Sequence, residues 1–306
     1  MAKKSRTEKL PTLSIIGVGR VGQTLARALH SAGYPIVALV FHDSVRGRKS
    51  RKRFSQDTFP GALLLGSDQL NRLPVTDVIL ITTPDDAIAE TASQLAAVQK
   101  GARRRAVMHT SGALSSEVLL PLAGSGFSVA SIHPLAAIDP ADGDEALRGA
   151  FFCIEGQKPA VAFAKSIAMD LGGTPIIINS KQKALYHAAA LMASPHLIAL
   201  FDLAVELMVS SGVKWADARK MLLPLVESTV NNLKARPPAT ALTGTFARGD
   251  MGTVERHLQV LSKGSLKVPP DALEIYRLLG LRSLELAKED GLDSKKINRI
   301  RKLLQG

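Results

Sequence analysis

The sequence predicts an α/β domain with an open, doubly wound and mostly parallel sheet, followed by an all-α domain. Apolar runs typical of buried strands alternate with helical patterns from residue 12 to about residue 179. A glycine-rich turn follows the first of these runs. Helical patterns continue from residue 180, and no strand pattern recurs. We therefore expect a disordered basic tail at 1–11, a sheet domain at 12–179 and a helical domain at 180–306.

The first turn has the pattern of a dinucleotide-binding Rossmann domain. Residues 13–16 form an apolar run, residues 17–22 read Gly-Val-Gly-Arg-Val-Gly, and a helical pattern then stops at Gly33 before a second apolar run at 36–41. The glycines allow a sharp turn, a close approach to the pyrophosphate, and tight packing of helix on strand. The predicted cofactor-binding residues here are Gly17, Val18, Gly19, Arg20, Val21 and Gly22. The alternative is a glycine turn in an ordinary α/β protein.

Residues at the end of the second strand determine the preference for NAD or NADP in a dinucleotide-binding domain. His42, Asp43 and Ser44 stand there, and a basic cluster at 46–53 follows. An acidic residue at this strand end binds the ribose 2′-hydroxyl of NAD, whereas arginines accommodate the 2′-phosphate of NADP. Because the basic cluster begins with Arg46, we favour NADP over NAD and place His42 and Arg46 in the cofactor site. The alternative is a solvated basic loop.

Four polar residues lie at the carboxyl ends of strands predicted within residues 77–84, 106–112 and 128–134. They are Asp85, His109, Ser111 and His133. The carboxyl ends of parallel strands share one edge of a sheet, where ligands bind. We assign Thr83, Pro84, Asp85 and His109 to the cofactor, and Ser111 and His133 to the catalytic side. The alternatives are hydrogen-bonded structural histidines and a carboxylate that caps the next helix.

The helical half contains two candidate groups of functional residues. Lys183 and His187 are four positions apart on one helical face, with Tyr186 beside them and Ser194 two turns beyond His187. We assign Lys183 and His187 to catalysis, Tyr186 and Ser194 to substrate binding. The second group is the loop at 241–250, whose Thr243, Arg248 and Asp250 suit an anionic substrate. The alternatives are a surface lysine and a helix-capping turn.

The composition narrows the classes of function. The formal net charge is +12 and aromatic residues make up 4% of the chain, which suits an anionic ligand but not stacked nucleic-acid bases. With one cysteine, Cys153, no internal disulfide is possible, which fits a reducing cytoplasm. We read no signal peptide or membrane span and expect a cytoplasmic protein that binds a small molecule, no nucleic acid and no metal. Leu- and Ala-rich helices in the second half suggest a homodimer.

Several motifs resemble a known family. They are His-Thr-Ser-Gly at 109–112, His-Pro-Leu at 133–135, Lys-x-x-Tyr-His-x-Ala-Ala at 183–190, and Leu-Thr-Gly-x-x-Ala-Arg-Gly-Asp at 242–250. From about residue 12 to about residue 290, the chain resembles bacterial Rossmann-like oxidoreductases with a C-terminal domain of unknown function. It departs from them at Thr245, where they typically have proline. The architecture is similar to that of 6-phosphogluconate dehydrogenase-like enzymes, ketopantoate reductases and pyrroline-5-carboxylate reductases.

The resemblance implies an NADP-dependent oxidoreductase acting on a small carbonyl compound, with a 2-oxo acid such as ketopantoate as the best guess. In the related enzymes a lysine and an asparagine four residues later face the nicotinamide; Lys183 and His187 stand at the matching place. We expect Lys183 to be the first candidate proton donor, His187 to polarise the carbonyl, and Arg248 to bind a carboxylate. The alternatives are an imine reductase, a metal-assisted enzyme using His109, His133 and His187, and a non-catalytic NADP-binding sensor.

Overall fold

The computed structural model describes residues 9–53, 59–100, 105–262 and 267–306. The chain divides into two compact units, one ending at Ser194 and the other beginning at Pro195. We refer to them as the sheet unit and the helical unit. Most of the tail expected at 1–11 lies outside the described residues.

Among the described residues, eight strands form one sheet in the order β3-β2-β1-β4-β5-β6-β7-β8. All neighbouring pairs are parallel except β6 and β7. The strand order reverses between β1 and β4, which is where open α/β sheets bind ligands. The strands are β1 (Leu13–Ile16), β2 (Ile36–Phe41), β3 (Leu63–Gly66), β4 (Val78–Ile81), β5 (Ala106–His109), β6 (Ser128–Leu135), β7 (Phe151–Gly156) and β8 (Thr174–Ile177).

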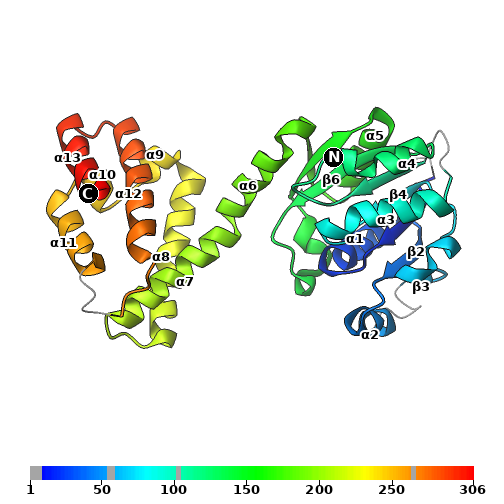
Figure 1. Cartoon of the computed structure of the whole chain (residues 1–306), viewed down its shortest axis with the longest axis horizontal. Coiled ribbons are helices and arrows are strands. Elements are labelled where there is room, and N and C mark those ends of the chain that lie inside the picture. The colour runs from blue at the N-terminus through cyan, green and yellow to red at the C-terminus, as the bar shows by residue number, and fades with distance from the viewer. Residues whose placement is uncertain (1–8, 54–58, 101–104, 263–266) are drawn as a thin grey trace. The chain divides into compact units, whose positions relative to one another are not determined.

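Helices cover both faces of the sheet (Figure 1). Leu80 and Val78 of β4 pack with α1 and α5, whereas Ile79 and Ile81 pack with α3 and α4. Successive side chains of a strand point to opposite faces, so a strand covered on both sides must be apolar throughout. The helices of this unit are α1 (Arg20–Ser31), α2 (Val45–Arg53), α3 (Asp85–Val98), α4 (Leu120–Gly124), α5 (Lys158–Asp170) and α6 (Lys183–Ala193), with short 3₁₀ helices η1 (Ser67–Arg72), η2 (Ser116–Leu119), η3 (Pro140–Leu147) and η4 (Ser180–Gln182).

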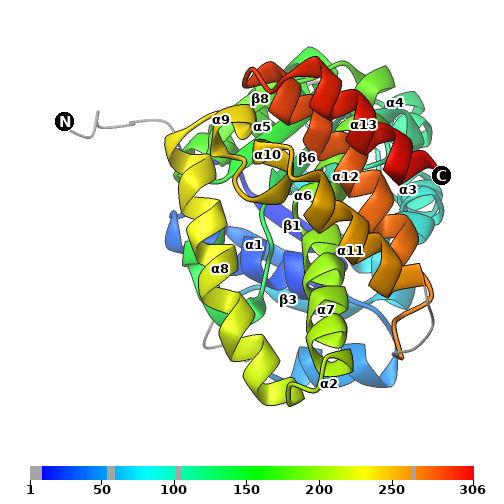
Figure 2. The same ribbon diagram turned by 90° about the vertical axis from the view of Figure 1, so that its left-hand side faces the viewer.

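The helical unit has its own core. Val254 of α11, Leu284 of α12, and Ile297 and Ile300 of α13 are buried together. Figure 2 shows α7 and α8 packed against each other in the same unit. Its helices are α7 (Pro195–Ser210), α8 (Trp215–Ala235), α9 (Pro238–Ala241), α10 (Thr245–Arg248), α11 (Met251–Ser262), α12 (Ala272–Glu289) and α13 (Ser294–Gln305).

The division between the units lies later than the expected boundary at 179/180. Helix α6 belongs to the sheet unit because the side chains of Lys183 and Tyr186 bond to residues of the sheet. The helical pattern that continues from residue 180 is interrupted at Ser194 (φ −128°, ψ −83°), just before Pro195. The basic stretch at 46–53, which we considered as a loop, lies in helix α2, and β3 is a strand that the sequence analysis did not identify.

One segment of the described residues, Ser180–Ser210, is long and apolar enough to cross a membrane by length and composition alone. Its mean hydropathy is 1.7, and 11% of the apolar window is buried. From the sequence alone we expected no membrane span, because no uninterrupted apolar run approaches about 18 residues. The buried Lys183 lies near the start of this segment, at the first turn of α6.

Candidate functional site

The turn between β1 and α1 depends on glycine for two different reasons. Gly17 has φ +95°, and a Cβ atom there would lie 2.6 Å from the backbone nitrogen of Thr83. A Cβ at Gly22 would lie 2.6 Å from the carbonyl oxygen of Gly17. At Gly19 the nearest such atom is 3.9 Å away, so the fold leaves this position open. Gly17 and Gly22 are therefore required by the turn itself, whereas the space beside Gly19 is available to a ligand.

The N-terminus of α1 is suited to an anion. Gly19 occupies the N-cap position without a side chain to bond the first N–H groups, and the described first turn of α1 carries no acidic residue. Free N–H groups and the positive end of the helix dipole favour a phosphate at such a terminus. The structure thus has an uncapped helix N-terminus where the strand order reverses, and pyrophosphate binding there stays a prediction.

A large cavity of about 1320 Å³ extends from this turn across the ends of β2 and β4. Of the predicted cofactor residues, those lining it are Gly17, Val18, Gly19, Arg20, His42, Thr83 and Pro84. The lining also includes residues that the sequence analysis did not select, among them Gln23, Arg27, Ser44, Lys49 and Ser50. The only feature of the sequence that could have identified these residues is their position close to the glycine turn or within the basic cluster. The side chain of Arg46 lies outside the described residues.

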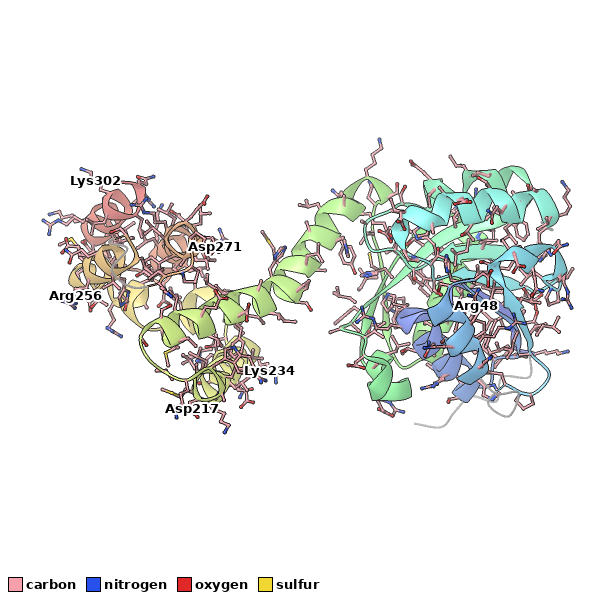
Figure 3. The ribbon with its side chains drawn as sticks, turned by 60° about the horizontal axis from the view of Figure 1, so that its bottom comes forward. Arg48, Asp217, Lys234, Arg256, Asp271 and Lys302 are labelled. Carbon is pink, nitrogen blue, oxygen red and sulfur yellow. The ribbon has the colours of Figure 1, made fainter. Side chains whose placement is uncertain are left out.

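The end of β2 holds an acid that is already paired. Arg48 Nη1 donates to Asp43 Oδ1 at 2.9 Å, and Figure 3 shows Arg48 on α2. The hydroxyl of Ser44 accepts a hydrogen bond from the backbone N–H of Gly47 at 3.1 Å. Both members of the ion pair are more than half exposed, so the pair contributes little to stability. Its consequence is local, because it engages the Asp43 carboxylate that follows β2. Asp43 does not line the large cavity, whereas the acids Asp68 and Glu90 do.

A second, smaller cavity of about 240 Å³ lies at the ends of β5 and β6. Arg20 lines both cavities, and Val21 lines only the second. The remaining lining residues are Thr110, His133, Pro134, Ala136 and Ile138. One apolar wall and a few polar groups at the carboxyl edge of the sheet are typical of a site for a small ligand. Thr110 was missed in the sequence analysis, although it stands between His109 and Ser111.

The predicted edge residues Asp85, His109 and Ser111 lie together. Ser111 Oγ donates to Asp85 Oδ2 at 2.8 Å. Nδ1 of His109 accepts from the backbone N–H of Ser111 at 3.1 Å, and its Nε2 lies 3.1 Å from the carbonyl oxygen of Ser115. Both ring nitrogens of His109 are therefore used inside the protein. Asp85 and His109 do not line the large cavity, so their assignment to the cofactor stays a prediction.

Lys183 is a buried neighbour of this cluster. Its side chain is 1% exposed, and Nζ donates to the carbonyl oxygen of Ser111 at 2.7 Å and to the hydroxyl of Ser131. Burial lowers the pKa of Lys183, while Glu155 opposes that shift. A lysine held in this way does not reach the cavity, so its geometry favours a supporting role over direct proton donation.

His133 contacts two neighbouring side chains of α6. Its Nδ1 lies 3.0 Å from the hydroxyl of Tyr186, and its ring packs edge-on against those of Tyr186 and His187, at 5.8 Å and 5.6 Å. Gly112 makes room for the two histidines: a Cβ there would lie 2.2 Å from His187 Nδ1 and 2.9 Å from His133 Nε2. Nδ1 of His187 is buried with no partner among the described residues.

Burial is the main influence on the two histidines of the sheet edge. It lowers the pKa of both His109 and His133 to about 4, and the charge of Lys183 adds to the effect. Burial also raises the pKa of Tyr186 well above its usual value. At neutral pH the imidazoles of His109 and His133 and the phenol of Tyr186 are therefore uncharged.

The remaining predicted substrate residues belong to other elements of the chain. Ser194 follows the last turn of α6, and Thr243, Arg248 and Asp250 belong to the helical unit. Asp250 accepts hydrogen bonds from the backbone N–H and hydroxyl of Thr253, at 3.2 Å and 2.8 Å, and so caps α11. Within the part of the chain that the structure describes, no group of three His, Cys, Asp or Glu side chains is arranged to hold a metal.

Comparison with known proteins finds two family models that match successive parts of the chain. Residues 3–134 match the model of a Rossmann-like domain, and residues 150–283 match a domain of unknown function, DUF2520. The chain joins a Rossmann-like domain to a DUF2520 domain. The resemblance based on its motifs is therefore confirmed. No curated protein matches the sequence.

Solved structures with little sequence identity share this fold. A candidate NADP oxidoreductase from Bacteroides fragilis has a TM-score of 0.69 at 21% identity, over 90% of this chain and 98% of its own. A protein from Thermotoga maritima has 0.69 at 23% identity, over 91% and 99%. Pyrroline carboxylate reductase from Plasmodium falciparum with NADP bound has 0.57 at 12% identity, over 95% and 98%.

Proposed function

We propose that this Rossmann-like/DUF2520 protein is an NADP-dependent reductase of a small carbonyl compound. The observation that carries the proposal is the pair of cavities that share Arg20, on either side of the α1 N-terminus at the reversal of strand order. A dinucleotide bound in an open α/β sheet crosses this point. The neighbours include an NADP-bound pyrroline carboxylate reductase and a reductive aminase in complex with NADPH, which supports the same class of cofactor.

The residues present fit such a cofactor. The large cavity suits the adenosine and pyrophosphate portion, with the open space at Gly19 and the uncapped N–H groups of α1 facing the phosphates. The smaller cavity suits the nicotinamide, beside Val21, Thr110 and His133. When bound, NADPH supplies the hydride. The protein orients the cofactor and the carbonyl and stabilises the charge that develops on oxygen.

The preference for NADP rests on the end of β2. Arg48 engages Asp43, the acid that follows β2. Lys49 and Ser44 line the large cavity, as do the acids Asp68 and Glu90. A cationic and hydroxyl-bearing surface suits a 2′-phosphate. We retain Arg46 as a predicted contact for that phosphate.

The substrate class is a small 2-oxo acid, with ketopantoate as the first compound to test. A cavity of about 240 Å³ restricts the substrate to a small molecule if it shares this space with the nicotinamide. The family resemblance supports a 2-oxo acid, and a carboxylate would pair with an arginine. An imine is the second candidate, because pyrroline carboxylate reductase and reductive aminase have the same fold. A sensor that binds NADP without turnover is the third.

We also propose a homodimer formed through the helical unit. Apolar side chains of α7 and α8 are exposed, including Ile198 at 70% and Leu225 at 63%. An apolar surface of this kind marks an interaction site. The apolar segment Ser180–Ser210 fits a protein interface because it is interrupted at Pro195 and its Lys183 is bonded within the sheet unit.

The decisive experiment follows NADPH oxidation by the purified protein with ketopantoate, and separately with 1-pyrroline-5-carboxylate, each repeated with NADH. Turnover of ketopantoate with a preference for NADPH supports the proposal. Turnover of the imine alone moves the assignment to an imine reductase, and tight NADPH binding without either turnover favours the sensor. In an Arg48→Ala variant, Asp43 is released from its ion pair, so we expect the kcat/KM ratio of NADPH to NADH to fall about tenfold. An unchanged ratio would contradict the role given to this pair.

A further inference from the structure

His133 is the one ionisable side chain that links the small cavity to the buried cluster, among the residues that the structure describes. It lines the cavity, and its Nδ1 is engaged by Tyr186. Its Nε2 has no hydrogen-bond partner among the described residues and is not sealed from solvent. One ring nitrogen is thus engaged by Tyr186, while the other lies next to Gly112 and has no partner among the described residues.

The partners of Tyr186 determine which nitrogen of His133 carries the proton. The Tyr186 hydroxyl lies 3.0 Å from His133 Nδ1, and burial together with the nearby Cys153 raises the pKa of Tyr186. Cys153 lies opposite His133 in the antiparallel register of β6 and β7. Imidazole nitrogen is a strong acceptor for a phenol O–H, whereas sulfur is a weak one. The favoured arrangement therefore has the Tyr186 O–H donating to His133 Nδ1, which leaves the imidazole proton on Nε2.

The surroundings also keep this ring neutral. Lys183 and His187 face it from α6, and both lower the pKa of His133, as does its burial. His109 lies on β5, Cys153 on β7, and Arg20 lines the cavity in front. The nearby carboxylate of Asp85 accepts a bond from Ser111, and that of Glu155 accepts two bonds from Ser116, so neither is paired with His133.

We propose that His133 acts as a neutral Nε2–H donor to the carbonyl oxygen of the substrate, and that Tyr186 is a positioning residue that fixes this tautomer. The proposal rests on the proposed reductase function and names the group that polarises its substrate. As hydride reaches the carbonyl carbon, the electron pair of the C=O bond moves onto oxygen, and the Nε2–H bond stabilises the developing charge. Water then protonates the oxygen and releases hydroxide, so His133 keeps its own proton throughout. Lys183 stabilises the arrangement through its hydrogen bonds to Ser111 and Ser131, and its charge disfavours protonation of His133.

The first test reads the tautomer directly and needs no turnover. Long-range ¹H–¹⁵N spectra of the ¹⁵N-labelled protein, with the His133 signals assigned by comparison with His133→Gln, should show an Nε2–H ring that stays neutral from pH 5.5 to pH 8. In Tyr186→Phe, the Nδ1–H form should become populated. Addition of the 2-oxo acid mimic oxamate to the NADPH-bound protein should shift the Nε2 proton downfield. An Nδ1–H or charged ring at pH 7, or an Nε2 signal that oxamate leaves unmoved, would overturn the proposal.

The second test compares three replacements of the same ring. Gln retains an N–H group near the position of Nε2, Asn retains one near Nδ1, and Ala retains neither. We expect His133→Ala to lower kcat by about 10² or more, a much larger effect than its effect on NADPH affinity. His133→Gln should recover at least tenfold over Ala, whereas His133→Asn should not. Equal rates for Gln and Ala, in variants with wild-type unfolding temperatures, would reject the donor role. If no carbonyl is turned over, the proposed function fails while the NMR result still decides the tautomer and the oxamate contact.

Discussion

Gly19 and Gly22 belong to the same short motif but are glycines for different physical reasons. The motif predicts both glycines from the sequence, and the known roles of this pattern distinguish them. The structure adds the physical reason for this chain: a side chain at Gly22 meets the Gly17 carbonyl oxygen, whereas one at Gly19 enters open space. One position serves the fold and the other serves the ligand.

This difference gives a matched pair of variants. Gly22→Ala should destabilise the protein by about 1–3 kcal/mol, because its Cβ presses on backbone that cannot move away. Gly19→Ala should leave the unfolding temperature within a degree or two but weaken NADPH binding about tenfold or more, since its methyl group occupies the pyrophosphate approach. Thermal unfolding and NADPH fluorescence titration measure the two effects. Similar losses of stability in both variants would contradict the assignment.

Side chains at the sheet edge were partly predictable. The rule that parallel strands end at one edge correctly brings Ser111 to Asp85 and places His109 beside them. The sequence did not reveal that Lys183 is buried, because burial depends on which surface the first turn of α6 packs against. The contact of Tyr186 with His133 is similar: the sequence separates the two residues by more than fifty positions, and only the packing of α6 on β6 joins them.

At the scale of elements, strongly periodic segments were the most predictable. The central strands lie within a few residues of the expected ranges, and the second half is helical as expected. Helix α2 was not identified, because its nine residues are almost all polar and offer no apolar face to read. Strand β3 is short and lies at the edge of the sheet, with its first residues incompletely buried. The helical pattern of α6 was clear, but the unit to which it belongs was not.

The exposed apolar face of α7 and α8 leads to a prediction about assembly. If it is a dimer interface, Ile198→Glu or Leu225→Glu should convert a dimer into a monomer, because an unpaired carboxylate would be buried at the contact. Size-exclusion chromatography with light scattering measures the mass. Val75→Glu is the matched control, since Val75 is 76% exposed in the sheet unit and should leave the dimer intact. A wild-type monomer at micromolar concentration would contradict the proposal.

At the scale of the whole molecule, the sequence gives a net charge of +12, and the structure shows where the basic residues lie. Lys49, Arg27 and Arg20 line the large cavity, which suits a cofactor rich in phosphate. Lys295, Lys302 and their neighbours lie on α13 of the helical unit. The total charge thus indicated an anionic partner in general, but only the fold shows which cations line a cavity.

The pH dependence of stability follows from the two buried histidines. His109 and His133 have pKa values of about 4 in the folded protein, against about 6.5 in an unfolded chain. Below pH 6.5 the unfolded chain therefore binds more protons than the native state, and stability falls as the pH falls, until the folded pKa near 4 is reached. Between pH 7 and pH 5 each ring should cost about 2 kcal/mol of unfolding free energy.

Thermal unfolding of the protein at intervals from pH 7.5 to pH 5 measures this loss. We expect the unfolding temperature to drop by several degrees over this range. His109→Gln, which removes a titrating ring 0% exposed at the sheet edge, should flatten the curve even if the variant is less stable at pH 7.5. Since carboxylates titrate mostly below this interval, the remaining slope in His109→Gln should be dominated by His133, and His109→Gln combined with His133→Gln should remove most of it. An equally steep curve in the double variant would mean that these two rings are not held neutral by the fold.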